Sequence, residues 1–144
     1  MSLLFGRIGR VQFVGFCFSA QLILLVLLFV TLGIVESYTP TINRNEEAED
    51  LVFLLFGIIS SVIYLNLVVR RLHDLQHSAW YALLAIVPFI NLALFLYLAF
   101  VPGVISDNEY GREPAPSTQN QLAISIVIVV FFIAAVIHSV TYPS

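Results

Sequence analysis

The chain has 144 residues, of which 60% are hydrophobic and only 10% are charged; six arginines, no lysine and nine acidic residues give a net charge of −3. A soluble domain of this size has too little interior to bury so much apolar surface, so lipid must be part of the solvent. The composition excludes a disordered chain, the acidic balance excludes a nucleic-acid-binding domain, and the single cysteine, Cys17, excludes a disulfide within the chain.

Four uncharged apolar runs predict transmembrane helices, which lie in chain order at residues 11–35, 51–69, 79–101 and 122–140. Each run has about 19 to 25 residues, and about 20 helical residues cross a hydrocarbon core. None of them alternates in polarity as a membrane β-strand does. We therefore expect an all-α fold, a polytopic helical membrane protein with four transmembrane helices, in which residues 1–144 form a single membrane domain.

The third run differs from the others because Pro88 lies in its middle. Proline lacks a backbone donor and leaves the carbonyl of Leu84, one turn earlier, without its helical partner. We expect a helix that crosses the membrane with a proline kink, and Trp80 at its start is suited to the membrane interface. The alternative is a re-entrant hairpin that returns to the side it left.

The arginines predict the orientation, since cytoplasmic loops carry an excess of basic residues. Four of the six precede the first span or follow the second: Arg7, Arg10, Arg70 and Arg71. With four spans these two segments share one side, which should be cytoplasmic, and both termini should face it. A re-entrant third run would move a fifth arginine, Arg112, to the same side.

Among the polar residues within the apolar runs, the strongest candidates for a role are Gln21, Asn91 and His138. Polar groups in lipid need partners, and hydrogen bonds between helices are the simplest use for them. A transport pathway is the functional alternative for the same residues.

The most informative polar segment follows the second run, at residues 66–78. If this helix continues to His77, the side chains of Asn66, Arg70, His73 and His77 share one face. Asp74 lies four residues after Arg70 and is predicted to pair with it, while Arg71 points elsewhere. Asn108 and Tyr110, in a later loop, are expected on the opposite side of the membrane.

Three interpretations of this face remain open. It is a polar helix end whose arginines reach the phosphate layer, or a specific site for an anionic headgroup, or a metal site built on His73 and His77. The i,i+4 spacing of the histidines permits chelation, but no Cys or Glu is close in sequence. We expect no metal and no cofactor.

Several motifs together resemble the bacterial integral-membrane family called domain of unknown function 805. The resemblance covers residues 3–116 and rests on Phe5-Gly6-Arg7-Ile8-Gly9-Arg10, Arg70-Arg71-Leu72-His73-Asp74, Ser78-x-Trp80, Pro88 and Asn108-x-Tyr110-Gly111-x-x-Pro114. It implies a small protein of the bacterial cytoplasmic membrane and supplies no established reaction. The motif residues expected to have structural roles are Gly6, Trp80, Pro88, Asn108, Tyr110 and Gly111.

No catalytic signature is present, neither G-x-S-x-G nor H-E-x-x-H, so we expect a non-enzymatic protein. Its predicted activity is lipid interaction or contact with an acidic partner, with membrane lipids, a homo-oligomer or another membrane protein as partners. The residues expected to bind the headgroup are Arg7, Arg10, Arg70, Arg71, His73 and Asp74. The alternative function is that of an oligomeric small transporter or channel.

Overall fold

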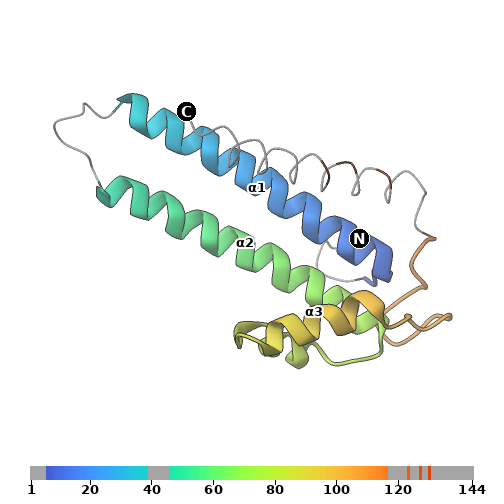
Figure 1. The fold of residues 1–144 in the computed structure, drawn as a ribbon. Helices are drawn as coiled ribbons and strands as arrows, with labels where there is room; N and C mark the ends of the chain where they lie inside the picture. The colour runs from blue at the N-terminus through green and yellow to red at the C-terminus, as the bar shows by residue number, and fades with distance from the viewer. Residues whose placement is uncertain (1–5, 39–45, 117–122, 124–126, 128–129, 131–144) are drawn as a thin grey trace.

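The chain folds as two long helices with a short helical hairpin packed against one end of them (Figure 1). This computed structural model describes residues 6–38 and 46–116, together with 123, 127 and 130. The helices, in chain order, are α1 (Arg10–Tyr38), α2 (Glu46–Asp74), the 3₁₀ helix η1 (Ala79–Ile86) and α3 (Ile90–Phe100). Regular structure in the described part is helical, apart from one isolated bridge between Asn108 and Gly111.

The helices α1 and α2 are long and apolar enough to cross a membrane. They contain the predicted runs 11–35 and 51–69 and extend beyond them at both ends. Only 11% of the most apolar window in each helix is buried, so most of their apolar surface faces outward. Helix α1 therefore confirms the first expected helix and α2 the second, while the run at 122–140 lies almost wholly outside the described residues.

The expectation of a proline-kinked helix over residues 79–101 is wrong. Helix η1 ends at Ile86 and α3 begins at Ile90, so the run is two short helices rather than one long one. Val87, which precedes the proline, is extended, as residues before proline usually are. Its N–H donates to the Leu84 carbonyl at 3.2 Å, which supplies the partner that Pro88 cannot. Phe89 then turns the chain with a φ of 65°.

The chain leaves α2 and returns to the same end of it. The N–H of Val104, beyond α3, donates to the carbonyl of Asp74, the last residue of α2, at 3.1 Å. Residues 79–101 therefore do not form the single long helix that was expected to cross, and both ends of this segment lie at the same end of α2. This is the arrangement of the re-entrant alternative.

Helix α2 stops because Gln76 adopts a left-handed conformation with a φ of 57°. The N–H of His77 donates to Leu72 at 2.9 Å and that of Gln76 to His73 at 3.2 Å, which is the Schellman pattern of a helix end. His77 thus lies outside the helix, and the predicted helical face that included it is wrong.

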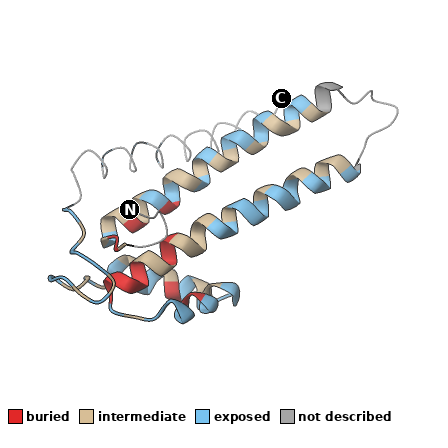
Figure 2. Cartoon of the chain, turned by 180° about the vertical axis from the view of Figure 1, so that it is seen from behind, coloured by how far each residue is buried: buried red, intermediate tan, exposed pale blue. Residues whose placement is uncertain are grey.

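The buried residues gather at the hairpin end of the molecule (Figure 2). Phe13 from α1, Val68 and Leu72 from α2, and Leu98 from α3 are the most deeply buried apolar side chains there. The Phe13 ring also packs on Phe95 of α3, with centroids 5.7 Å apart. This small core positions the start of α1, the end of α2 and the hairpin against one another.

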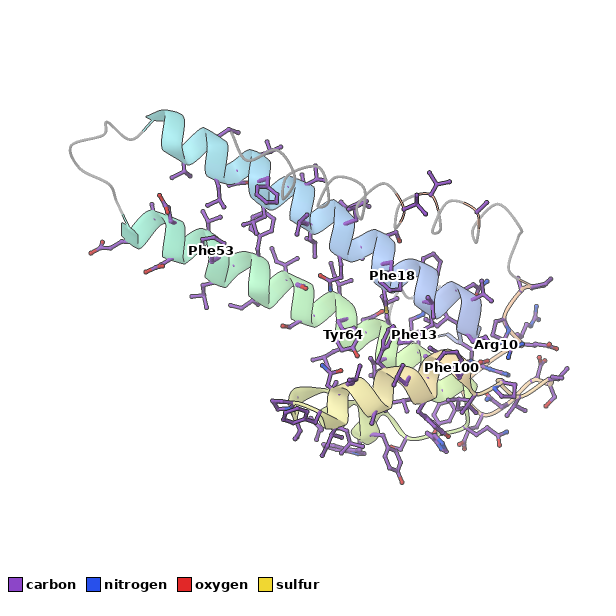
Figure 3. The ribbon with its side chains drawn as sticks, viewed as in Figure 1. Arg10, Phe13, Phe18, Phe53, Tyr64 and Phe100 are labelled. Carbon is purple, nitrogen blue, oxygen red and sulfur yellow. The ribbon has the colours of Figure 1, made fainter. Side chains whose placement is uncertain are left out.

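Two polar side chains within the apolar runs form the expected hydrogen bonds between helices. Ser60 of α2 donates to the Gln21 side chain of α1 at 2.9 Å. The hydroxyl of Tyr64 donates to the Asn91 side chain at 2.7 Å, joining α2 to the start of α3; Figure 3 shows Tyr64 between these helices. His138 lies outside the described residues.

The hairpin arrangement predicts which loops share a side of the membrane. In a Cys17→Ser background, single cysteines at Ser78 and Ser106 should respond alike to a membrane-impermeant thiol reagent on whole cells. A cysteine at Glu47, at the other end of α2, should respond oppositely. Reaction of Ser106→Cys together with Glu47→Cys, and protection of Ser78→Cys, would instead require residues 79–101 to cross.

Candidate functional site at the arginine-rich end

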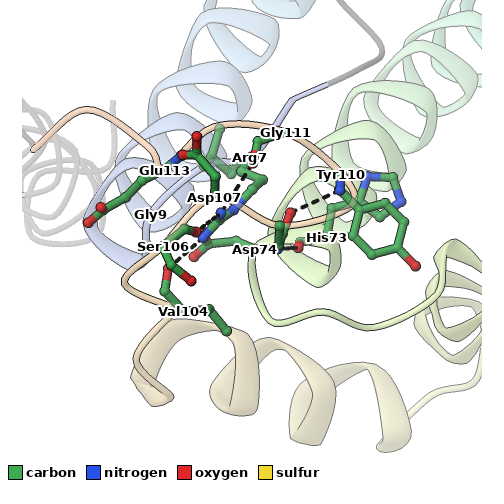
Figure 4. A network of polar contacts seen from close by, with 12 residues as sticks. Arg7, Gly9, His73, Asp74, Val104, Ser106, Asp107, Tyr110, Gly111 and Glu113 are labelled. Carbon is green, nitrogen blue, oxygen red and sulfur yellow. Dashed lines mark hydrogen bonds and ion pairs between the residues drawn. The ribbon is translucent and has the colours of Figure 1, made fainter.

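A single buried carboxylate, that of Asp74, forms ion pairs with two arginines (Figure 4). Arg7 approaches one carboxylate oxygen through Nη2 at 3.0 Å and Nε at 3.1 Å. Arg71 donates through Nη1 to the other oxygen. The Asp74 side chain is 2% exposed and both arginine side chains are 0% exposed. We refer to these three residues as the clasp.

The clasp joins the segment before α1 to the loop that follows α3. Besides Asp74, the Arg7 guanidinium donates through Nη2 to the carbonyl of Val104 and through Nη1 to those of Ser106 and Gly111, the last at 3.3 Å. Arg7 lies about 100 positions from these carbonyls in the chain, so this one side chain closes the molecule.

Arg71 joins α2 to the end of α3. Its Nε donates to the Leu98 carbonyl at 2.9 Å and its Nη2 to the Val101 carbonyl, while Nη1 also reaches Ile8 at 3.4 Å. The last carbonyls of a helix have no partners within it, and a cation there also complements the helix dipole. Arg71 therefore caps α3 from a neighbouring helix.

Gly103 permits the close approach of the returning chain to the clasp. A Cβ atom at this position would overlap Asp74 Oδ2 and lie 2.7 Å from its Cγ and 3.1 Å from Arg71 Nη1. Only glycine leaves room for the ion pair. The requirement for a missing side chain at this position emerges only from the packing.

His73 lies against the loop that follows α3. Its ring stacks on Tyr110 with centroids 4.2 Å apart, and Asn108 donates from Nδ2 to the His73 carbonyl at 2.9 Å. Desolvation and the neighbouring Glu109 raise the pKa of Tyr110, so its phenol is uncharged at neutral pH. The expectation that Asn108 and Tyr110 lie on the opposite side of the membrane is wrong, because the hairpin returns to the side of His73.

Two further arginines at this end have no partner among the described residues. No hydrogen bond or ion pair joins Arg70 to another described side chain, and its Nε is buried without a hydrogen-bond partner. Arg10 is exposed and lines a pocket of about 330 Å³ together with Gln12, Gly103 and Glu113. The predicted pairing of Asp74 with Arg70 is wrong: the carboxylate turns to Arg71, three residues away, and to Arg7.

The loop after α3 also changes the charge at this end. In the sequence, residues 1–10 and 66–78 contain four arginines and one carboxylate, that of Asp74. Because the hairpin returns, three more carboxylates reach the same end, on Asp107, Glu109 and Glu113, together with Arg112. Five arginines and four carboxylates then lie at this end, which is therefore close to neutral as a whole.

The remaining motif residues have structural places. Gly6 has a φ of 150° beside the Arg70 guanidinium, and Gly111 has a φ of 135° in the turn that it forms with Asn108. Trp80 is 78% exposed at the start of η1.

His73 and His77, the two histidines of the metal-site interpretation, have separate partners: His73 stacks on Tyr110, and His77 forms a hydrogen bond with the hydroxyl of Tyr97 at 2.9 Å. The described residues contain no group of three or more metal-ligating side chains.

The clasp predicts a large loss of stability when Asp74 is neutralised. Asp74→Asn would leave two buried guanidinium groups without a counter-charge, and breaking a buried pair in this way costs about 3–5 kcal/mol. Thermal unfolding of the purified protein in mild detergent measures the effect. Glu109→Gln removes an exposed carboxylate from the same end and should change the midpoint little; equal stability of the two variants would contradict the clasp.

Gly103→Ala should also destabilise the protein, because the added methyl group must displace the Asp74 carboxylate. Overpacking of this kind costs about 1–3 kcal/mol. The matched control is Gly57→Ala, where a Cβ meets no atom within 4 Å and alanine favours the helix by about 0.5–1 kcal/mol. In the same assay the unfolding midpoint should fall for Gly103→Ala and rise for Gly57→Ala.

Comparison with known proteins agrees with a membrane location. Residues 3–112 match the family described as "Protein of unknown function (DUF805)". Inner membrane protein YhaH of Escherichia coli (strain K12) is 32% identical over 66 residues, which are 46% of this chain and 54% of that protein. Inner membrane protein YhaI of the same strain is 36% identical over 61 residues, 42% of this chain and 52% of that protein.

The chain thus spans about half the length of these curated relatives. No solved structure matches it. The family match covers most of the chain, including Arg7, Asp74 and the loop that His73 contacts, and the two long apolar helices agree with the relatives' inner-membrane names. This helical membrane protein belongs to the DUF805 family.

Proposed function

We propose that this protein is a non-enzymatic protein of the bacterial cytoplasmic membrane that binds anionic phospholipid headgroups through Arg10 and Arg70. The observation that carries the proposal is the division of the arginines into two classes. Arg7 and Arg71 are saturated by Asp74 and backbone carbonyls, whereas Arg10 and Arg70 have no partner among the described residues. Arg7, Arg71, His73 and Asp74, which the sequence suggested as headgroup ligands, instead support the site from within.

Arg70 has hydrogen-bond donors that can bind an oxyanion. Its Nε lies buried without a hydrogen-bond partner, and a buried donor without a partner destabilises a fold by about 1–3 kcal/mol. The planar guanidinium fork matches a phosphate group. A headgroup phosphate at the membrane surface would bind the terminal nitrogens, Nη1 and Nη2, of the same guanidinium group and provide its counter-charge.

The pocket beside Arg10 has a size and a chemistry that suit a headgroup. It is lined by one cation, Arg10, by the amide of Gln12 and by two acidic residues, Glu113 and Asp74, around about 330 Å³. Asp74 is already paired with Arg7 and Arg71, so the carboxylate that faces a ligand is that of Glu113. A phosphate bearing a hydroxyl-containing substituent complements this set, because Arg10 binds the phosphate and the carboxylate accepts from a hydroxyl. Phosphatidylglycerol is an anionic lipid with both features.

The arginines favour a cytoplasmic location for this end. With a re-entrant hairpin, five arginines share it, and Arg44 alone lies in the connection between α1 and α2. This bias is larger than four spans would give, and basic loops remain cytoplasmic during insertion. A single crossing by residues 122–140 would then put the C-terminus outside, in contrast to the sequence expectation of two cytoplasmic termini.

The headgroup proposal predicts that Arg10→Gln with Arg70→Gln lowers the retention of phosphatidylglycerol. Each arginine near an anionic surface contributes about 1 kcal/mol. Native mass spectrometry of the protein from mild detergent, with phosphatidylglycerol and phosphatidylcholine added in equal amounts, measures the retained lipid. An Arg→Lys pair should lose part of the preference if the guanidinium fork is required.

Arg112→Gln is the matched control, since Arg112 is exposed at the same end but has no part in the proposed site. An unchanged lipid profile in the Arg10→Gln, Arg70→Gln variant would refute the site. An equal loss in Arg112→Gln would indicate diffuse charge attraction instead. A defined larger ring in the same spectra would support the alternative of an oligomeric transporter or channel.

A further inference from the structure

The η1–α3 hairpin extends along only about half of α2. Asn91, near its turn, contacts Tyr64, which lies ten residues before the end of α2 at Asp74. At 1.5 Å per residue this is about 15 Å along the helix, half of a hydrocarbon core of about 30 Å. The lengths agree, because eight 3₁₀ residues in η1 and eleven α-helical residues in α3 each span about 16 Å.

The outward surface of the hairpin is apolar and large. Phe89 at the turn is 90% exposed, and Ile86 and Phe100 are also mostly exposed. No charged residue occurs between positions 79 and 101. Trp80 and Tyr81, at the start of η1, are aromatic residues of the kind that occupy the membrane interface. This surface therefore fits the lipid acyl chains of one leaflet rather than water.

The backbone at the turn is suited to that depth. The N–H of Ile90 donates to Pro88 at 2.8 Å, that of Asn91 to Val87 at 2.8 Å, and that of Ala93 to Phe89 at 3.1 Å. Each of these bonds gives a turn N–H a partner, which lowers the cost of removing the turn from water. The hairpin can thus enter the apolar layer of one leaflet.

The consequence is a difference in cross-section between the two halves of the protein. Figure 1 shows η1 and α3 beside one end of α1 and α2 only. If α1 and α2 span the bilayer, one leaflet would accommodate these two helices and the other would accommodate η1 and α3 as well. A full crossing by residues 122–140 would add the same area to both leaflets and leave the difference unchanged.

We propose that the hairpin is a wedge in one leaflet and that the protein concentrates where the leaflet on its arginine-rich side is convex. A body that is wider in one leaflet fits a bilayer curved toward that side with less deformation of the surrounding lipid, and mismatch between protein and bilayer shape has an energetic cost. The inference rests on the same-side topology of the hairpin ends and is independent of headgroup binding by Arg10 and Arg70.

Membrane tubes drawn from giant vesicles test the proposal. The full chain, as Cys17→Ser with Ser78→Cys, is reconstituted into phosphatidylcholine alone, where anionic headgroups have no part. An impermeant thiol dye added outside then labels only molecules whose arginine-rich end faces the outer, convex leaflet of the tube. We expect a ratio of dye density in the tube to that in the vesicle above one.

Molecules inserted in the opposite orientation provide an internal comparison. When all the protein is labelled before reconstitution and the outer dye is quenched, the remaining signal should be depleted from the tube. A ratio of one for both orientations, or enrichment of both, would overturn the wedge. A loss of phosphatidylglycerol binding by Arg10→Gln with Arg70→Gln would not affect this result.

Alanine substitutions in each half of the molecule show which half causes the enrichment in the tube. Leu83→Ala, Ile86→Ala and Phe89→Ala reduce the exposed bulk of the hairpin and should move the ratio toward one. The matched set Phe53→Ala, Leu54→Ala and Ile58→Ala removes the same residue types from the narrow half and should maintain or increase the ratio. If the triple hairpin variant does not fold, Phe89→Ala alone suffices; equal ratios for hairpin and control variants would contradict the proposal.

Discussion

The carboxylate of Asp74 is the group through which the distant parts of this protein are held together. It is almost wholly buried, and it accepts from the guanidinium groups of Arg7 and Arg71 at once. Two guanidinium groups in such a place would repel each other strongly without it, and removing charges from water is itself costly. Their remaining donors bond to backbone carbonyls, so that each side chain is held in one position by several contacts.

The hairpin depends on this arrangement. The last carbonyls of its second arm, α3, accept no hydrogen bond from within the helix. Arg71 donates to two carbonyls at this helix end, those of Leu98 and Val101. Its first arm begins where α2 is stopped by the left-handed Gln76. Between the arms, Pro88 prevents a continuous helix. The local break at the proline and the anchoring at the clasp together return the chain to the side from which it came.

This arrangement separates the arginines by role. Those that bond to Asp74 are structural, because they are buried and saturated. Arg10 and Arg70 differ, since neither has a partner among the described residues. The Nε of Arg70 is buried without a hydrogen-bond acceptor. The carboxylates that arrive with the returning loop leave the end nearly neutral, so selectivity for a headgroup would come from local geometry rather than from overall charge.

The membrane character of the protein, the two long helices, the family membership and the polar contacts of Gln21 and Asn91 could be predicted from the sequence. These features depend on composition, on the length of apolar runs and on short motifs, all of which are local along the chain. That the Arg-Arg-Leu-His-Asp motif ends the second long helix could also be predicted, but its internal pairing could not.

The partners of that motif were decided by tertiary structure. Helical spacing favoured Arg70 for Asp74, but the carboxylate turns to Arg71 because Arg7 and the α3 carbonyls approach from the other side. Likewise, proline in an apolar run is compatible with either a kink or a reversal. The choice depends on contacts that the returning chain makes far from the proline in sequence: the Val104 N–H donates to the Asp74 carbonyl, and Gly103 leaves room for the Asp74 carboxylate beside Arg71.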